Sequence, residues 1–188
     1  MGTTGWIILG LIALIVVYLI FLYNRLVALR QTVNQSWSDI SVQLKQRHDL
    51  VPNLVETVKG YATHEKSTLE AVVAARNAAV AAQGPAAQAQ AENMLTGALR
   101  QLFALAEAYP DLKANQNFLQ LQSELADLEN KIAASRRFFN NAVQEYNTAI
   151  EQFPAVLIAR NMGFQSREFF ELDEAERAAV STPPQVKF

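Results

Sequence analysis

The densest group of side chains that could do chemistry lies in a short stretch between residues 45 and 56. It combines two cations, an imidazole, two carboxylates and an amide: Lys45, Arg47, His48, Asp49, Asn53 and Glu56. At helical spacing, Lys45 and Asp49 stand four residues apart and predict an opposite-charge pair. With an imidazole among carboxylates, the chemistry to test is metal binding and acid–base catalysis.

The motifs that such catalysis requires are missing from the sequence. The two histidines are His48 and His64. His64-Glu65 opens like a His-Glu-x-x-His zinc helix, but Thr68 stands where the second histidine belongs. The sequence also lacks the Glu-x-x-His pairs of di-iron bundles, a Gly-x-x-x-x-Gly-Lys phosphate loop, Gly-x-Gly-x-x-Gly, Gly-x-Ser-x-Gly and any cysteine. It therefore predicts a protein that is not an enzyme and needs no metal or cofactor.

Two interpretations of the polar stretch are open. In the first, it is a solvated stripe from which Arg47 reaches out of an apolar seam with its stem buried. In the second, Arg30 and Arg47 sit in the seam and pair with carboxylates on a facing helix, which would fix the register or select a partner helix. The candidate carboxylates are Glu124, Asp127 and Glu129. The candidate interaction or register residues are Arg30, Arg47, Asp49, Asn53 and Glu56.

The element that precedes this stretch is an uncharged run from Trp6 to Tyr23. Eighteen residues at the helical rise span roughly 27 Å, close to the hydrocarbon thickness of a bilayer. Met1–Gly5 holds no Lys or Arg, and the run ends without an Ala-x-Ala cleavage site, so a cleaved signal peptide does not fit. We expect an uncleaved transmembrane anchor over residues 6–23, after a short N-terminal segment, residues 1–5.

Charge sets the expected orientation. No basic residue precedes the span, and Arg25, Arg30, Lys45 and Arg47 follow it, so the positive-inside rule places the N-terminus outside and the rest in the cytoplasm. Arg25 and Arg30 are candidate lipid-proximal basic residues. The formal net charge of −2 indicates no general affinity for nucleic acid.

Beyond the span, apolar residues step by four and three, the period of helices packed in a bundle or coiled coil. In the first such helix these are Leu26, Val33, Trp37, Ile40, Leu44, Val51, Leu54, Val58 and Tyr61. Pro52 predicts a kink near His48. Gly60 predicts the end of this helix, and Ser67-Thr68-Leu69-Glu70 a capping-box start for the next, up to about Gln83. Further helices are expected over about 86–109 and 118–153.

The predicted fold is therefore all-α: a transmembrane helix followed by an antiparallel, four-helix-like bundle over residues 24–153, with long first and last helices. An alternative fuses the first two bundle helices into one rod through Glu65 and Leu69. Residues 154–188 form a C-terminal segment with an extended tail. Its apolar and aromatic clusters are expected to pack on the bundle, or else to contact the membrane interface or a second copy: Val156, Leu157, Ile158, Phe164, Phe169 and Phe170. Val186 and Phe188 are candidate docking residues of the tail.

One long run resembles the signature of a known family. Residues 42–65, VQLKQRHDLVPNLVETVKGYATHE, are similar to the signature block of the LemA family of bacterial membrane proteins. Shorter matches cover essentially the rest of the chain: Tyr23–Val27, Glu107–Asn115, Tyr146-Asn147, Phe153-Pro154 and Pro184–Phe188. The resemblance implies a single N-terminal anchor in the bacterial inner membrane and an antiparallel helical bundle. It implies no catalytic residues, because the family has no settled activity.

Two functional hypotheses follow. The first is a non-enzymatic scaffold that forms a homo-oligomer and organises or remodels the membrane, which the long apolar seams, the apolar residues after Phe153 and the basic residues after the span suit. Some members of the family are associated with internal membranes around magnetosomes. Other members accompany membrane proteases and envelope stress, which favours an adaptor that presents its bundle or tail to another membrane protein. The expected partners are thus the lipid bilayer, further copies of the chain and possible membrane proteins, but not nucleic acid.

Overall fold

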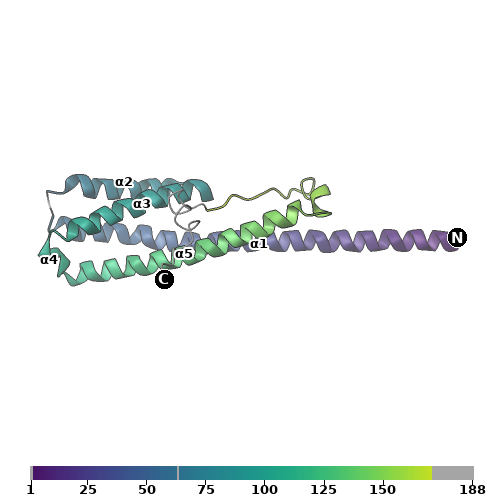
Figure 1. Ribbon diagram of the computed structural model, residues 1–188, viewed down its shortest axis with the longest axis horizontal. Coiled ribbons are helices and arrows are strands. Elements are labelled where there is room, and N and C mark those ends of the chain that lie inside the picture. The colour runs from purple at the N-terminus through teal and green to yellow at the C-terminus, as the bar shows by residue number, and fades with distance from the viewer. Residues whose placement is uncertain (1, 63, 171–188) are drawn as a thin grey trace, which may run out of the picture. The chain divides into compact units, whose positions relative to one another are not determined.

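The computed structural model describes residues 2–62 and 64–170, which form helices and no strand (Figure 1). In chain order the elements are α1 (Thr3–Lys59), α2 (Lys66–Ala81), α3 (Pro85–Ala106), α4 (Pro110–Lys113), α5 (Gln116–Glu151) and the 3₁₀ helix η1 (Ala155–Leu157). This confirms the predicted all-α fold, with a long apolar helix at the N-terminus and a helical bundle. The candidate tail residues Val186 and Phe188 lie outside the described part of the chain.

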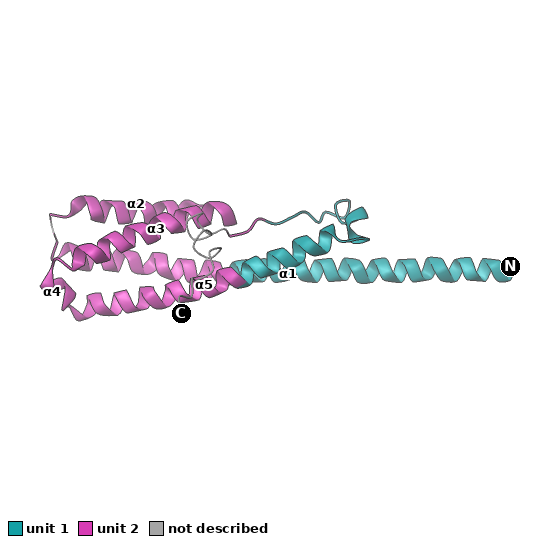
Figure 2. Ribbon diagram, in the orientation of Figure 1, with its two compact units in different colours: residues 1–38, 138–167 teal, residues 39–137, 168–188 magenta. Residues whose placement is uncertain are grey.

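The chain forms two compact units (Figure 2). Unit 1 combines the N-terminal segment up to Ser38 with Phe138–Arg167, and unit 2 combines Asp39–Arg137 with the segment that begins at Glu168. The two long helices α1 and α5 each contribute to both units.

Unit 2 is a bundle of four helical segments, namely the last part of α1, α2, α3 and the first part of α5 (Figure 2). Its core is aliphatic, and its centre is fully buried: Val51, Leu54, Val58, Val72, Leu95, Leu102 and Leu112. On α1 the buried residues Val51, Leu54 and Val58 repeat every three or four positions, so this helix buries one stripe against the others. The period predicted for the first bundle helix describes the observed core up to Val58, whereas Tyr61 is 43% exposed.

The first bundle helix ends just before Gly60, as the sequence predicted. α1 stops at Lys59, and the amides of Tyr61 and Ala62 both donate to the Val58 carbonyl, at 3.0 and 2.9 Å. Because α2 starts only at Lys66, the alternative of a single rod through Glu65 is wrong. Toward the N-terminus α1 continues without interruption to Thr3.

Two predicted helix ends need correction. α2 begins at Lys66 rather than after a Ser67 cap, and its N-cap residue Glu65 makes no side-chain capping bond. The Glu65 carboxylate instead accepts a hydrogen bond from the Tyr109 hydroxyl at 3.1 Å, so a contact between distant segments fixes this end. Burial of Tyr109 and its bond to Glu65 raise the pKa of that hydroxyl.

The third predicted helix is two helices in the structure. α3 ends at Ala106, and Pro110 opens the short helix α4. Proline suits this position, because the first turn of a helix leaves its N–H groups unbonded in any case. Asn115 then caps α5: its Oδ1 accepts from the Phe118 amide at 3.0 Å, while its Nδ2 donates to the Tyr61 hydroxyl at 2.9 Å.

Unit 1 packs the middle of α1 against the last part of α5. Trp37 and Phe139 lie with ring centroids 5.4 Å apart, and Tyr146 is fully buried. After α5 the chain turns through η1 and is held by two hydrogen bonds: Asn147 Nδ2 donates to the Arg167 carbonyl at 2.9 Å, and the Arg167 amide donates to Asn147 Oδ1 at 2.8 Å.

The N-terminal part of α1 is apolar and exposed. Its most apolar window has a mean hydropathy of 2.9, and 6% of that window is buried. Among the described residues, α1 is the one helix that is long and apolar enough to cross a membrane. By contrast, buried core helices of water-soluble proteins hide their apolar faces.

The C-terminal apolar cluster is oriented differently from its prediction. Phe164 and Phe170 are buried, as expected, but Val156 and Leu157 are 48% and 65% exposed. Ala155 and Ala159 are the residues of this turn that pack inward. Val156 and Leu157 therefore lack the buried environment of Phe164 and Phe170.

We expect Leu95→Ala to lower the free energy of unfolding by about 2–5 kcal/mol, because it leaves a cavity at a fully buried position. Met94 is 58% exposed on the same helix, so Met94→Ala is the matched control and should change stability by less than about 0.5 kcal/mol. Denaturant unfolding of the full-length protein in detergent, followed by circular dichroism, measures both. Equal losses would show that Leu95 is not a core residue.

Candidate functional site

The most chemically unusual feature of unit 2 is a carboxylate in its interior. Glu92 on α3 is 4% exposed, although it is surrounded by a core of aliphatic residues. An unpaired charge in such a place is strongly destabilising, so the neighbours of Glu92 must supply donors. They do so from two helices.

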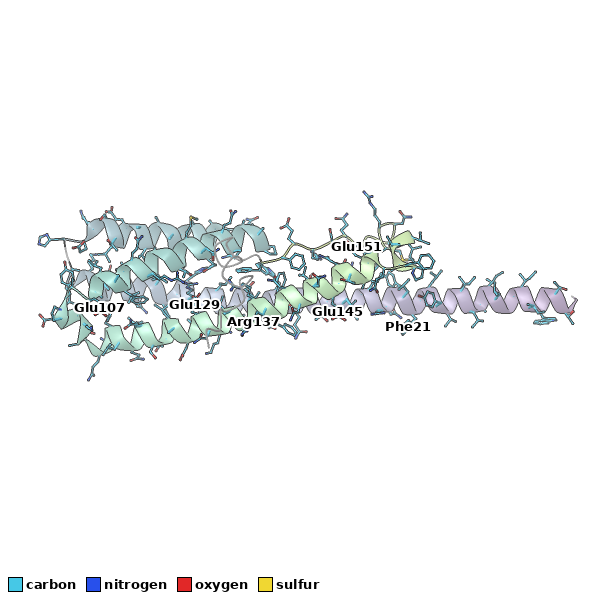
Figure 3. The ribbon with its side chains drawn as sticks, viewed as in Figure 1. Phe21, Glu107, Glu129, Arg137, Glu145 and Glu151 are labelled. Atoms are coloured by element: carbon cyan, nitrogen blue, oxygen red, sulfur yellow. The ribbon has the colours of Figure 1, made fainter. Side chains whose placement is uncertain are left out.

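Arg47 on α1 supplies the opposite charge. Its side chain is 4% exposed; Nη1 lies 3.4 Å from Glu92 Oε2, and Nη2 lies 3.1 Å from Glu129 Oε2 on α5. Nη2 also donates to the Thr96 hydroxyl at 2.7 Å. Of the three predicted candidates, Glu129 is therefore the one that contacts Arg47, and it is half-exposed (Figure 3).

His48 and Gln88 complete the shell around Glu92. His48 Nε2 lies 2.6 Å from Glu92 Oε1, and since a carboxylate accepts, this ring nitrogen is the donor. Gln88 Nε2 donates to the same oxygen at 2.9 Å and to the Ala79 carbonyl of α2, also at 2.9 Å. We call Arg47, His48, Gln88, Glu92, Thr96 and Glu129 the polar cluster.

A second polar contact replaces a backbone hydrogen bond that α1 lacks at Pro52. Proline has no amide hydrogen, so the carbonyl of His48, four residues earlier, loses its helical donor. Arg76 on α2 replaces it, with Nε donating to the His48 carbonyl at 3.1 Å. Because α1 remains helical through Pro52, this bond and the polar cluster meet at the same turn of α1.

The remaining residues of the predicted group do not join the polar cluster. Asp49, Asn53 and Glu56 are exposed. Asp49 pairs with Lys45 at 2.6 Å, and this hydrogen bond lowers the pKa of the Asp49 carboxyl. Glu56 pairs with Lys59 at 3.4 Å. These pairs are solvated, and such pairs add little to stability.

The two candidate lipid-proximal arginines belong to unit 1. Arg25 is exposed. The Arg30 guanidinium lies 5.1 Å from the centroid of the Phe164 ring, a cation–π distance. The contact seen for Arg30 is thus an aromatic face, where the sequence had suggested a carboxylate.

Sequence reasoning missed Gln88, Glu92 and Arg76. All three nevertheless occupy seam positions. Extending the steps Leu95, Leu99 and Leu102 backward by three and four residues reaches Glu92 and Gln88. On α2, Arg76 falls between Val72 and Ala79 in the same way. The signal was therefore the period of the pattern, read for polar as well as apolar residues.

The chemistry of this arrangement is that of a fixed ion-pair network. The Arg47 guanidinium and the Glu92 carboxylate each contact several partners, so their charges and hydrogen-bonding groups are largely satisfied inside the bundle. Within the described part of the chain, no group of three or more His, Cys, Asp or Glu side chains is placed to hold a metal ion. The network connects α1, α2, α3 and α5 through side-chain contacts.

The sequence pattern that defines the LemA family matches residues 36–188, which include the whole polar cluster. The chain belongs to the LemA family. The family resemblance predicted from residues 42–65 is therefore confirmed.

Named relatives extend over most of the chain. Magnetosome protein MamQ of Magnetospirillum gryphiswaldense is 27% identical over 202 residues, covering 94% of this chain and 74% of the relative. Magnetosome protein MamQ 2 of Paramagnetospirillum magneticum is 25% identical over 191 residues, covering 88% and 70%. Protein LemA of Metamycoplasma hominis is 27% identical over 163 residues, covering 85% and 73%. The chain is thus similar to two magnetosome proteins and to a protein named LemA, and none of these names describes a catalytic activity.

Replacing Glu92 tests the network. Glu92→Gln removes the charge that balances Arg47 inside the bundle, and we expect it to lower the free energy of unfolding by about 3 kcal/mol. Glu129→Gln is the matched control, because Glu129 contacts the same guanidinium but is half-exposed, and it should cost less than about 1 kcal/mol. Denaturant unfolding of full-length protein in detergent measures both, and a larger loss at Glu129 would contradict the network as described.

The Arg76 bond to the His48 carbonyl predicts a coupling with Pro52. Arg76→Met should destabilise the native protein by about 1–2 kcal/mol, because it leaves that carbonyl without a donor. In a Pro52→Ala background, the restored amide of residue 52 can bond to the carbonyl, so Arg76→Met should cost clearly less. A double-mutant cycle on unfolding free energies measures the difference. Equal costs in the two backgrounds would exclude the coupling.

Proposed function

We propose that this member of the LemA family is a membrane-anchored, non-enzymatic scaffold that self-assembles and supports the organisation or remodelling of the bacterial inner membrane. The observation that carries the proposal is the continuity of α1. One helix, Thr3–Lys59, contains both the exposed apolar stretch and a stripe of the bundle core. The same element would thus anchor the protein and organise its folded part, with no loop between the two roles.

The proposed topology is single-pass. The apolar stretch would cross the bilayer, with the N-terminus outside and the bundle in the cytoplasm, since the basic residues follow the span. Arg25 is exposed just after the stretch, where it can meet lipid headgroups.

The names of the relatives support a role in membrane organisation. Two of them are named magnetosome proteins. The similarity covers at least 88% of this chain in both cases, so it includes most of the bundle. A scaffold that shapes or supports a membrane would need this folded part as well as an anchor.

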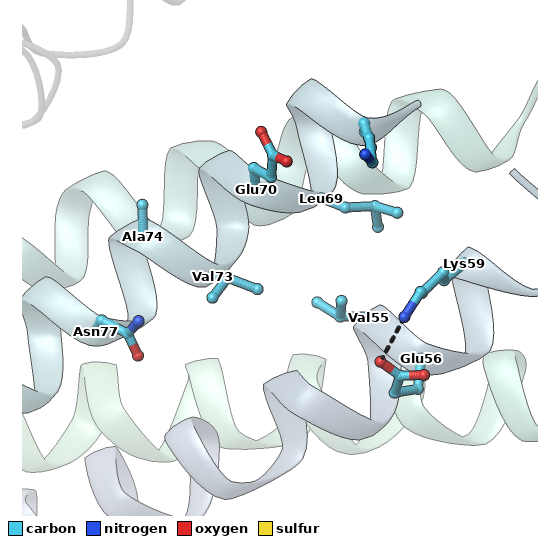
Figure 4. A pocket seen from close by; sticks show the side chains of 9 residues that line it. Val55, Glu56, Lys59, Leu69, Glu70, Val73, Ala74 and Asn77 are labelled. Carbon is cyan, nitrogen blue, oxygen red and sulfur yellow. Dashed lines mark hydrogen bonds and ion pairs between the residues drawn. The ribbon is translucent and has the colours of Figure 1, made fainter. Parts of the chain in front are cut away.

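Self-assembly requires a surface for another copy, and unit 2 offers one. A groove of about 540 Å³ lies between α1 and α2 (Figure 4). Its apolar lining is formed by Val55, Leu69, Val73 and Ala74. Its charged lining combines two acids and two bases, namely Glu56, Lys59, Lys66 and Glu70.

A surface that carries both charge signs around an apolar floor is self-complementary. In a two-fold dimer the same patch meets itself, so acids of one copy can face bases of the other. We therefore propose that this groove receives a helix of a second copy.

The second candidate function is that of an adaptor. An apolar groove with a polar rim is also how proteins bind an amphipathic helix of another protein. In that case the groove or the C-terminal tail, including Val186 and Phe188, would dock onto another membrane protein such as a protease. The two functions differ in whether the purified protein assembles by itself.

The mass of the detergent-extracted, full-length protein tests the scaffold, measured by light scattering. We expect a discrete assembly for the native sequence and a shift to smaller species for Val73→Arg, which places a charge in the groove. Val80 lies on the same helix, is 54% exposed and does not line the groove, so Val80→Arg should assemble normally. A monomeric native protein would overturn the scaffold, and normal assembly of Val73→Arg would exclude the groove as the contact.

Deleting Ser181–Phe188 tests the adaptor in the same preparation. A scaffold without these residues should still assemble and should keep its membrane-protein neighbours in cross-linked cell extracts. Loss of a specific neighbour without loss of assembly would instead favour the adaptor.

A further inference from the structure

The turn that follows α5 exposes four large apolar side chains, while Ile158 is half-buried and two alanines are buried. Four residues within ten positions are exposed: Phe153 by 81%, Leu157 by 65%, Val156 by 48% and Met162 by 41%. The residues that pack inward between them are Ala155 and Ala159. Single exposed apolar residues are ordinary, but a group of this density marks an interaction surface.

Contacts within unit 1 place this turn beside the end of the apolar stretch of α1. The Phe164 ring lies 5.6 Å from the ring of Tyr23, edge to face, where the uncharged run ends. The Phe164 ring also contacts the Arg30 guanidinium, which lies over its face. Phe164 therefore contacts both Tyr23, the last aromatic residue of the apolar stretch, and Arg30.

The charges of the turn fit the same location. From Phe153 to Ser166 the sequence holds one charged residue, Arg160, and no acid. Arg160 is exposed. A segment with large apolar side chains, one exposed cation and no carboxylate is suited to the boundary between acyl chains and anionic headgroups.

The exposed side chains of α1 next to this turn indicate that lipid covers the turn. Phe21 on α1, labelled in Figure 3, is 64% exposed, and Ile20 is 56% exposed. These side chains face lipid if the apolar stretch crosses a bilayer. The exposed turn lies beside that stretch, so one lipid phase can cover both.

We propose that residues 153–162 form a second, interfacial membrane contact, in which Phe153, Val156, Leu157 and Met162 enter the headgroup region beside the transmembrane helix. This inference rests on the proposed membrane anchoring of α1. It adds a site to the protein: a lipid-binding surface formed by a segment more than a hundred residues after the anchor in sequence.

The absence of cysteine from the sequence makes the test direct. Single substitutions Val156→Cys, Phe21→Cys and Val80→Cys are labelled with an environment-sensitive fluorophore in full-length protein. The protein is reconstituted in phosphatidylethanolamine–phosphatidylglycerol vesicles. Val156 and Val80 are matched valines, 48% and 54% exposed, in the turn and on α2. Quenching by a lipid with a nitroxide near its headgroup reports contact with the interface.

We expect the label at position 156 to be quenched to within a factor of about two of the label at position 21, and the label at position 80 to remain bright. Quenching at 21 without quenching at 156 would overturn the inference while leaving the anchor intact. No quenching at 21 would overturn the anchor itself, and the inference with it. Energy transfer between labels at 156 on different copies, without lipid quenching, would show a protein–protein contact and also overturn the inference.

A variant measures what the contact contributes. In the double variant Val156→Asp, Leu157→Asp, the emission of a label at Phe153→Cys should shift toward its value in water. The same label should lose most of its quenching by the nitroxide lipid. Val80→Asp is the control and should leave that emission unchanged. Retention of the membrane-like emission in the double variant would overturn the role of these side chains.

Discussion

The structure of the bundle depends on one constraint, the need to satisfy a carboxylate that is buried among aliphatic side chains. Glu92 takes its counter-charge from Arg47, and hydrogen bonds from His48 and Gln88. Gln88 also reaches a backbone carbonyl of α2, and Arg47 extends to Glu129 on α5. A sliding or rotation of any of these helices would leave a charge or a polar atom unsatisfied inside the bundle. Apolar seams tolerate such displacements, because aliphatic contacts are not directional.

This arrangement favours specificity over maximum stability. A buried ion pair gains little over well-packed apolar residues of similar volume, because desolvation offsets the Coulomb attraction. It does discriminate strongly between the correct register and displaced ones. At Pro52, the helix α1 lacks one internal hydrogen bond, and Arg76 of α2 supplies the missing donor to the His48 carbonyl. Both devices act at the same level of the bundle.

Most of the fold could be predicted from sequence, because it follows from hydrophobic periodicity and from Gly60. The apolar stretch, the bundle helices and the resemblance of residues 42–65 required no coordinates. The errors arose where tertiary contacts decide a local outcome. The helix expected over about 86–109 ends at Ala106, and Pro110 begins another. α2 begins at Lys66 without the expected Ser67 cap, and the carboxylate of the preceding Glu65 accepts a hydrogen bond from Tyr109. For the polar cluster, Arg47 was a candidate, whereas Glu92 was missed because it lies among alanines that carry a weak hydrophobic signal.

The two hydrogen bonds between Asn147 and Arg167 have a consequence for entropy. They close the chain between α5 and the residues that follow η1 into a loop whose ends are fixed. A flexible loop of this length would lose conformational freedom on reaching any surface, and that loss would oppose binding. Here much of the loss occurs during folding, since Ala155, Ala159 and Phe164 are already packed. The loop is preorganised, so its apolar tip can meet another phase without first having to fold.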